Sequence, residues 1–295
     1  MFHVSRTGSE ALGRPLKALR RQRTGVAALA LASLLGGWMG PASADSPIPV
    51  GATFGVHGGY GLSGALDLGT RAVPTAVFKD LQGANQAVRS DDDFDLDGAM
   101  AGLQTRYLTA WGPWLWGGAA DFSYTDLEQT AYDDVACPNA NLCATDDQFD
   151  LQISSVALFS GVLGRPVGRH FVFLRAGLAL ADAELDITDG NINTLGQPSS
   201  GPNTGRADDD AWLTGFSVGV GDDISLDRHL SVGLRYDYTR FGDTDLDAAG
   251  SGFCDPGTTS PLCAGRLGQT VSGTYPMTLE SPALHLFKVE LNYRF

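Results

Sequence analysis

Apolar and polar residues alternate one by one along much of this chain. The final segment shows the pattern most regularly: Phe287, Val289, Leu291, Tyr293 and Phe295 form one face, and Lys288, Glu290, Asn292 and Arg294 form the other. Because successive side chains of a β-strand point to opposite faces, this period of two predicts a strand with one apolar and one polar face.

The same alternation recurs upstream. Regular segments fall near 54–62, 114–125, 172–180, 212–221 and 230–239, and two less regular ones fall near 94–109 and 148–163. With the final segment, they predict about eight strands. An even number of antiparallel strands with one apolar face is typical of closed barrels that cross a membrane.

The connections between these strands alternate in length. Long ones fall near 65–93, 126–148, 184–210 and 242–280, and short ones fall near 110–113, 164–170 and 222–228. A barrel of the outer membrane has long loops outside and short turns in the periplasm. The sequence therefore predicts an all-β protein: a single closed antiparallel transmembrane β-barrel with long extracellular loops and short periplasmic turns.

Aromatic residues are expected to form two girdles at the membrane interfaces. We expect one girdle at the periplasmic edge, from Tyr107, Trp111, Trp114, Phe171, Tyr293 and Phe295. We expect the other at the outer edge, from Phe122, Tyr124, Phe149, Trp212 and Tyr238.

The N-terminal segment predicts export. A basic stretch over residues 1–23 precedes the apolar run Gly25–Trp38, and Ala42 and Ala44 form an A-x-A end before Asp45. These are the three parts of a secretory signal peptide. We expect Sec-type export, cleavage after Ala44, and one barrel domain over residues 45–295.

Charge excludes some functions. The chain has a net charge of −14, and residues 45–295 hold 14 basic and 33 acidic residues, so a nucleic-acid partner is not expected. The four long connections hold 22 of these acids and 5 bases. Such loops attract divalent cations or basic surface ligands. Clusters such as Asp91–Asp93 and Asp208–Asp210 lack the spacing of a calcium loop, so neither a metal site nor a cofactor is predicted.

The four cysteines form two close pairs, Cys137 with Cys143 and Cys254 with Cys263. Export to an oxidising compartment favours disulfides over zinc ligation. Four cysteines allow three connectivities, and pairing within each loop is the simplest.

Three segments carry a resemblance to a family. Gly98–Tyr124, Thr214–Asp243 and the terminal VELNYRF resemble the OmpA/OmpX-like superfamily of small outer-membrane barrels, which includes Omp25-like and opacity-type porin-family surface proteins. The resemblance implies an outer-membrane location among phospholipid and lipopolysaccharide. It also implies a C-terminal signal for the barrel-assembly machinery at Leu291, Tyr293 and Phe295. It specifies the fold better than any activity.

The predicted register points eight charged side chains into the barrel: Arg106, Asp121, Arg175, Arg235, Asp237, Lys288, Glu290 and Arg294. An eight-stranded barrel is just wide enough for its own side chains to fill. A salt-bridge network that plugs the interior is the preferred interpretation, and a charge-lined cation channel is the alternative.

Three functions therefore remain open: a plugged barrel that displays acidic, disulfide-braced loops, a narrow cation-preferring channel, and a lipid A-modifying enzyme. His57 and His285 lie within predicted strands, but neither has a serine two residues later, as the barrel deacylase pattern requires. We predict a structural or surface-interaction protein without catalytic residues.

Overall fold

The computed structural model describes residues 50–64, 67–70, 96–132, 148–188, 206–253 and 265–295, all within one compact unit, 42–295. The described residues form strands and include no helix. The strands are β1 (Gly51–Ser63), β2 (Asp67–Thr70), β3 (Asp97–Trp111), β4 (Trp114–Tyr132), β5 (Gln148–Val167), β6 (His170–Thr188), β7 (Arg206–Ser225), β8 (Leu230–Phe241), β9 (Thr244–Phe253), β10 (Thr270–Glu280) and β11 (Ala283–Arg294).

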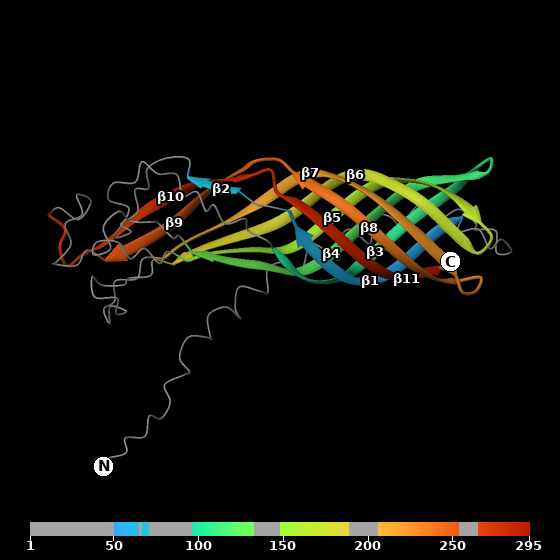
Figure 1. The fold of residues 1–295 in the computed structure, drawn as a ribbon, viewed down its shortest axis with the longest axis horizontal. Coiled ribbons are helices and arrows are strands. Elements are labelled where there is room, and N and C mark those ends of the chain that lie inside the picture. The colour runs from blue at the N-terminus through green and yellow to red at the C-terminus, as the bar shows by residue number, and fades with distance from the viewer. Residues whose placement is uncertain (1–49, 65–66, 71–95, 133–147, 189–205, 254–264) are drawn as a thin grey trace, which may run out of the picture. The chain divides into compact units, whose positions relative to one another are not determined.

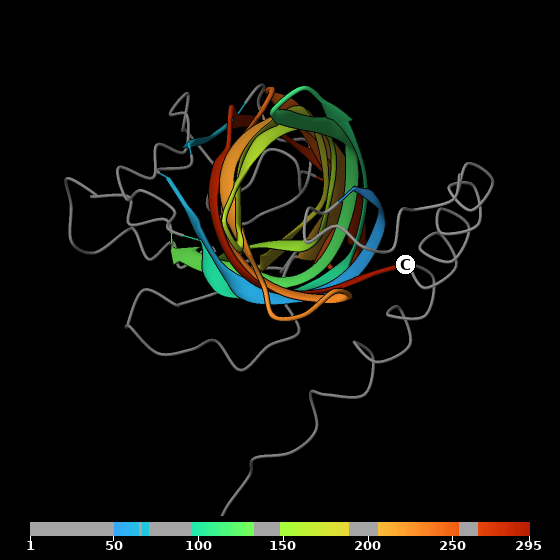
Figure 2. The same cartoon turned by 90° about the vertical axis from the view of Figure 1, so that its right-hand side faces the viewer.

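Eight of these strands form a closed antiparallel ring. Its order is β1, β3, β4, β5, β6, β7, β8 and β11, and β11 pairs again with β1. Viewed along its axis, the sheet closes on itself (Figure 2). The prediction of a closed antiparallel barrel of about eight strands is confirmed.

Tight turns join the strands at one end of the ring, here called the turn end. Gly112 and Pro113 join β3 to β4, Gly168 and Arg169 join β5 to β6, and residues 226–229 join β7 to β8. Gly112 and Gly168 have φ angles of 62° and 64°, which non-glycine residues rarely adopt. These turns lie at the predicted short connections, and the C-terminus lies at the same end (Figure 1).

The opposite end of the barrel is here called the loop end. Strands occupy much of the sequence predicted to form long loops there, and this part of the sheet is called the loop-end extension. β4 and β6 continue to Tyr132 and Thr188, β7 already begins at Arg206, and β9 and β10 form a hairpin that prolongs β8 and β11. This hairpin and β2 lie at the loop end in Figure 1. The prediction of loops throughout these segments is wrong, because the alternating pattern continues into them. Residues 71–95, 133–147, 189–205 and 254–264 lie outside the described part.

The interior of the barrel has three layers along its axis. The loop-end half holds one large apolar cluster, which includes Leu127, Leu151, Ile153, Leu185, Leu246 and Leu279, each at most 1% exposed. The middle holds charged and polar side chains. The turn end holds a second apolar cluster of Leu108, Leu115, Val162, Phe171 and Phe173.

The outward side chains also change polarity along the barrel axis, as β6 shows. From Val172 to Leu180, every second side chain is apolar and points outward. From Asp182 to Asp186, the outward side chains are acidic, and those between them, such as Leu185, are buried. Nine residues at about 3.3 Å each, tilted by about 40°, cover roughly 20–25 Å, which matches the apolar band of a membrane barrel.

Two members of the predicted aromatic girdles lie inside the barrel instead. Phe149 and Phe171 are each 2% exposed and belong to the loop-end and turn-end clusters. Phe171 has the same parity as the inward Phe173, 5.3 Å away between ring centroids. A register shift between Ile153 and Ser155 changes the parity of β5: the buried positions are odd-numbered up to Ile153 and even-numbered from Val156 onwards. This bulge turns Phe149 inward.

Candidate functional site: the barrel interior and its outer surface

Asp121 on β4 is the centre of the charged layer. Its carboxylate accepts a hydrogen bond of 2.5 Å from Nη2 of Arg175 on β6, and Nη2 of Arg235 on β8 lies 2.6 Å from its other oxygen. Three strands from different parts of the chain thus meet at one buried carboxylate, whose residue is 3% exposed.

Arg235 joins Asp121 to two further acids. Its Nε lies 2.9 Å from a carboxylate oxygen of Asp237, and its Nη1 lies 2.6 Å from one of Glu290. The guanidinium of Arg175 lies 3.6 Å from the other oxygen of Asp237. A guanidinium has five N–H donors, so one arginine can contact several carboxylates at once.

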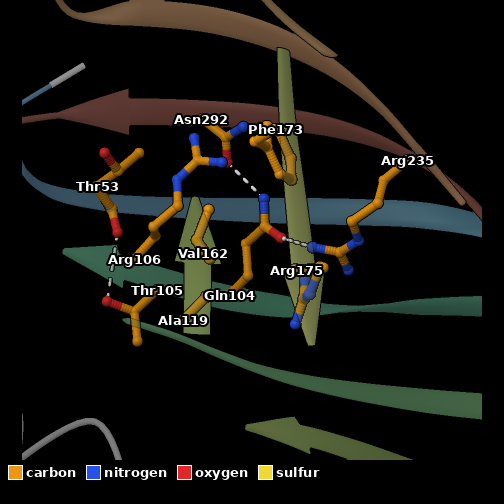
Figure 3. Close-up of a pocket in the computed structure, with 10 residues that line it drawn as sticks. All are labelled: Thr53, Gln104, Thr105, Arg106, Ala119, Val162, Phe173, Arg175, Arg235 and Asn292. Carbon is orange, nitrogen blue, oxygen red and sulfur yellow. Dashed lines mark hydrogen bonds between the residues drawn. The ribbon is translucent and has the colours of Figure 1, made fainter. Parts of the chain in front are cut away.

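Gln104 extends the network towards the turn end. Its Nε2 donates to Glu290 at 2.7 Å. Figure 3 shows its other two bonds: Nε2 also donates to Asn292 at 2.5 Å, and Oε1 accepts from Arg235 at 2.8 Å. Nearby, Arg106 forms an ion pair and hydrogen bond with Asp223, and its guanidinium lies 5.1 Å from the ring centroid of Phe173.

The charged layer is electrically balanced. The buried cations are Arg106, Arg175, Arg235 and Lys288, and the buried anions are Asp121, Asp223, Asp237 and Glu290. Buried charges are tolerated when they are paired and hydrogen-bonded. Four cations and four anions therefore remain inside without a net charge that would draw in counter-ions.

Seven of the eight charged residues predicted to point inward lie in this layer. The remaining one, Arg294, is only half-buried and donates to the backbone carbonyl of Arg228 at the turn end. Sequence reasoning missed Asp223, because the predicted strand ended at Gly221. Asp223 keeps the inward parity of Gly219 and Gly221, which is the signal that could have identified it.

Inward glycines make the network possible. A Cβ at Gly219 would lie 2.1 Å from Oδ1 of Asp237, and one at Gly233 would lie 2.5 Å from Oδ1 of Asp223. Such contacts are far shorter than van der Waals distances. The charged side chains therefore occupy the space that larger residues would fill.

A small cavity lies in the charged layer. Its volume is about 10 Å³, and it is lined by residues that include Thr53, Gln104, Arg106, Arg175 and Asn292 (Figure 3). This volume corresponds to about one water molecule. The cavity therefore offers space for a single buried water.

The four described histidines occupy three environments. Nε2 of His57 lies 2.8 Å from Oγ of Ser123, which also accepts from Lys288 at 3.2 Å, and all three residues are buried. His285 faces outward, and its Nδ1 lies 2.7 Å from Oη of Tyr236. His170 and His229 lie at the turn end, where His170 contacts Asp222 at 2.8 Å.

Acidic side chains cover the outside of the loop-end extension. The outward residues include Asp126, Glu128, Asp150, Asp182, Glu184, Asp186, Asp208 and Asp210. Glu184 lies directly opposite Asp210, and Asp186 lies opposite Asp208. Facing like charges repel. Arg206 relieves part of the repulsion through a 3.0 Å contact with Asp186, and this hydrogen bond raises the pKa of the guanidinium.

At the turn end, Asp227 shapes the turn between β7 and β8. Its carboxylate accepts hydrogen bonds of 2.7 Å from the backbone N–H groups of His229 and Leu230. These bonds lower the pKa of Asp227, since they favour the charged form.

Among the described residues, no helix is long and apolar enough to cross a membrane. In the same part of the chain, no group of three histidine, cysteine or acidic residues could hold a metal ion. The four cysteines and the A-x-A end of the expected signal peptide lie outside the described residues.

Comparison with known proteins gives one family match. A family model described as the outer membrane protein beta-barrel domain matches residues 27–253. A search of curated protein sequences found no match.

Several solved structures are similar. The outer-membrane protease OmpT from Escherichia coli is 10% identical with a TM-score of 0.46, covering 86% of this chain and 100% of that one. OprG from Pseudomonas aeruginosa is 12% identical with a TM-score of 0.39, covering 84% and 98%. Ail of Yersinia pestis, solved with the heparin analogue sucrose octasulfate, is 11% identical with a TM-score of 0.34, covering 83% and 100%.

The matched family model spans most of the chain, including strands β1 to β9. This match agrees with the ring of antiparallel strands and with its outward apolar band. The protein therefore belongs to the outer-membrane β-barrel domain family and is an integral protein of the outer membrane.

Proposed function

We propose that the protein is a non-conducting outer-membrane barrel that displays acidic loops at the cell surface. One observation carries the proposal: a charge-balanced network fills the middle of the barrel, between two apolar layers. A rigid scaffold of this kind is suited to holding binding loops in place.

The sealed interior argues against the alternative of a cation channel. A channel needs a continuous path lined by water or by groups that replace the hydration shell of the ion. Here the extracellular half of the interior is lined by leucine, isoleucine and alanine side chains. An ion that reached the middle would also have to separate paired charges, such as Asp121 from Arg175 and Arg235.

The buried Ser123 and His57 support a non-enzymatic role. Their 2.8 Å contact could belong to a nucleophile and its base, but such a pair also needs a third group that orients the base. Among the described residues, Nδ1 of His57 has no hydrogen-bond partner, and Ser123 is 0% exposed. A lipid substrate would have no route to this serine. Mass analysis of lipid A from cells with and without the protein tests this part of the proposal.

We propose that the long extracellular loops bind the ligands of this protein. We propose cleavage of the signal peptide after Ala44 and local disulfides that join Cys137 to Cys143 and Cys254 to Cys263. The acidic surface fits basic surface ligands or divalent cations, and the C-terminal Leu291, Tyr293 and Phe295 fit recognition by the barrel-assembly machinery. The mass of the mature N-terminus and peptide mapping under non-reducing conditions test the cleavage site and the disulfides.

Planar-bilayer recording tests the sealed interior. The purified protein, with insertion confirmed by protease protection, is expected to give no regular current steps. Regular steps with a preference for cations would overturn the non-conducting part of the proposal and favour the channel.

Deletion of loops tests whether the loops bind ligands, independently of conduction. Replacing residues 133–147 and 254–264 by short glycine-serine turns leaves the described strands intact. Cells with this variant are expected to bind less of a polycationic probe than wild-type cells with the same amount of barrel. Equal binding by both would contradict the display role, whatever the bilayer recordings show.

A further inference from the structure

The outward residues just beyond the apolar band differ around the barrel. On four strands this position is acidic: Asp97 on β3, Asp126 on β4, Asp182 on β6 and Asp210 on β7. On β5, Ser154 lies there and donates to Asp182 at 3.0 Å. The outer rim of the membrane band therefore repels anions along these strands.

β8 and β11 interrupt this acidic rim. The two strands run side by side (Figure 1), and Arg240 of β8 pairs with Ala283 of β11. His285 pairs with Tyr238 and so lies diagonally next to Arg240 on the same outward face. The rim thus has one basic segment, made of Arg240, His285 and two tyrosines.

Aromatic contacts hold this segment in place. Oη of Tyr236 lies 2.7 Å from Nδ1 of His285, and the ring centroids of Tyr238 and His285 are 5.2 Å apart. Tyr236 also packs against Phe287, at 5.0 Å between centroids. The imidazole is therefore fixed at the lipid-facing surface, beneath the arginine.

Arg240 itself is exposed and has no ion pair or hydrogen bond within the described part of the chain. The nearby carboxylate of Asp243 is engaged with the backbone N–H and hydroxyl of Ser281, at 2.9 and 2.7 Å. An arginine at this depth extends its apolar stem along the lipid face and places its guanidinium at the headgroups.

We propose that Arg240 and His285 form a site for a phosphate group of lipid A in the outer leaflet. A guanidinium binds phosphate through two parallel, charge-assisted hydrogen bonds. The acidic rim elsewhere favours this segment over the other strands. The site lies on the outside of the barrel, so it is independent of whether the interior conducts.

Native mass spectrometry of the purified full barrel with bisphosphorylated lipid A tests the site. Arg240→Gln is expected to weaken lipid A binding about tenfold, the effect of one lost charge-assisted contact. Arg240→Lys should weaken it less, because it keeps the charge but loses the planar fork. The matched control is Arg206→Gln, an outward arginine that already contacts Asp186, and it should bind lipid A as the wild type does. Heat-modifiable migration in gels confirms that each variant is folded.

Four results would overturn the proposal. Equal binding by wild type and Arg240→Gln would show that Arg240 does not hold the lipid. An equal loss in Arg206→Gln would indicate general surface charge, and an unchanged difference with dephosphorylated lipid A would exclude phosphate recognition. If inorganic phosphate at the same concentration displaced the lipid, the ligand would be soluble phosphate and not lipid A.

Discussion

At the scale of single residues, Arg235 is the side chain on which the interior depends most. It contacts the carboxylates of Asp121, Asp237 and Glu290 and the amide of Gln104. No neutral side chain can satisfy three acids that are buried together. The interior charges are therefore coupled, and removal of one arginine leaves several groups uncompensated.

We predict that Arg235→Met lowers the free energy of unfolding by about 3–5 kcal/mol, since an uncompensated buried charge costs this much. Arg106→Met is the matched comparison, and its smaller effect reflects its single acidic partner, Asp223. Urea unfolding in detergent micelles, followed by tryptophan fluorescence, measures both variants. Equal stability of Arg235→Met and the wild type would show that the network contributes nothing net.

Gly219 gives a second prediction at this scale. Its alanine variant would place a Cβ 2.1 Å from Oδ1 of Asp237, whereas a Cβ at the outward Gly118 would meet nothing closer than 3.9 Å. Overpacking of a filled interior typically costs about 1–3 kcal/mol. Gly219→Ala should therefore unfold at lower urea concentration than the wild type, and Gly118→Ala should not. A fall of the same size in both would point to strand flexibility rather than to interior space.

At the scale of elements, the strands extend beyond the membrane band around an apolar interior. Leu185 and Ile187 on β6 are 0% exposed and pack in the same cluster as Leu151 of β5 and Leu246 of β9. The acids beside them face outward. This is the pattern of a soluble sheet, in the same strands that lower down have the pattern of a membrane barrel.

Leu185→Ala is predicted to loosen the extension and to leave the membrane-embedded ring intact. Truncation of a buried leucine costs about 2–5 kcal/mol, and this loss falls on an element outside the bilayer. Protease added to intact cells should cleave the variant faster within the extension, while the protected membrane fragment stays the same size. Asp186→Ala, its outward neighbour, should be cleaved only as fast as the wild type. Equal cleavage of Leu185→Ala and wild type would show that burial of Leu185 does not stabilise the extension.

The sequence predicts the lower part of the strands well and the extension poorly, for a physical reason. Alternation shows that a strand has two faces, but not which face is inside. Glu184, Leu185, Asp186 and Ile187 alternate as regularly as the membrane segment below them, with the opposite polarity inward. The bulge after Ile153 changes the parity of β5 as well, and its only sequence signal is the irregular register near 148–163.

The sequence predicts most of the charged residues of the interior network, but it does not predict which of them contact one another. Arg175 and Asp237 could be assigned to the inward face from parity alone. The contacts of Arg175 with Asp237 and with Asp121 depend on the stagger of β4, β6 and β8 around the ring, which no local pattern records. Gln104 and Asn292 likewise belong to the network only because the strands bring them within 2.5 Å of each other.

At the scale of the whole molecule, the polarity of the barrel's interior and of its outer face changes towards the extracellular side. Within the membrane band, apolar side chains face lipid and charged side chains occupy the middle of the barrel; beyond the band, apolar side chains fill the barrel and acids face outward. This arrangement supports the proposal of a non-conducting barrel that presents a negative surface to the medium.

Thiol labelling along β6 tests this exchange of polarity most directly. Single cysteines are placed outward at Asp182 and Glu184, inward at Ala183 and Leu185, and in the lipid band at Leu178, with the native cysteines replaced by serine. Intact cells then receive a small charged thiol reagent. We predict rapid labelling at 182 and 184, and at least about tenfold slower labelling at 178, 183 and 185, because lipid or the apolar core covers these positions. Rapid labelling at 183 and 185 would show a water-filled interior and contradict the sealed barrel.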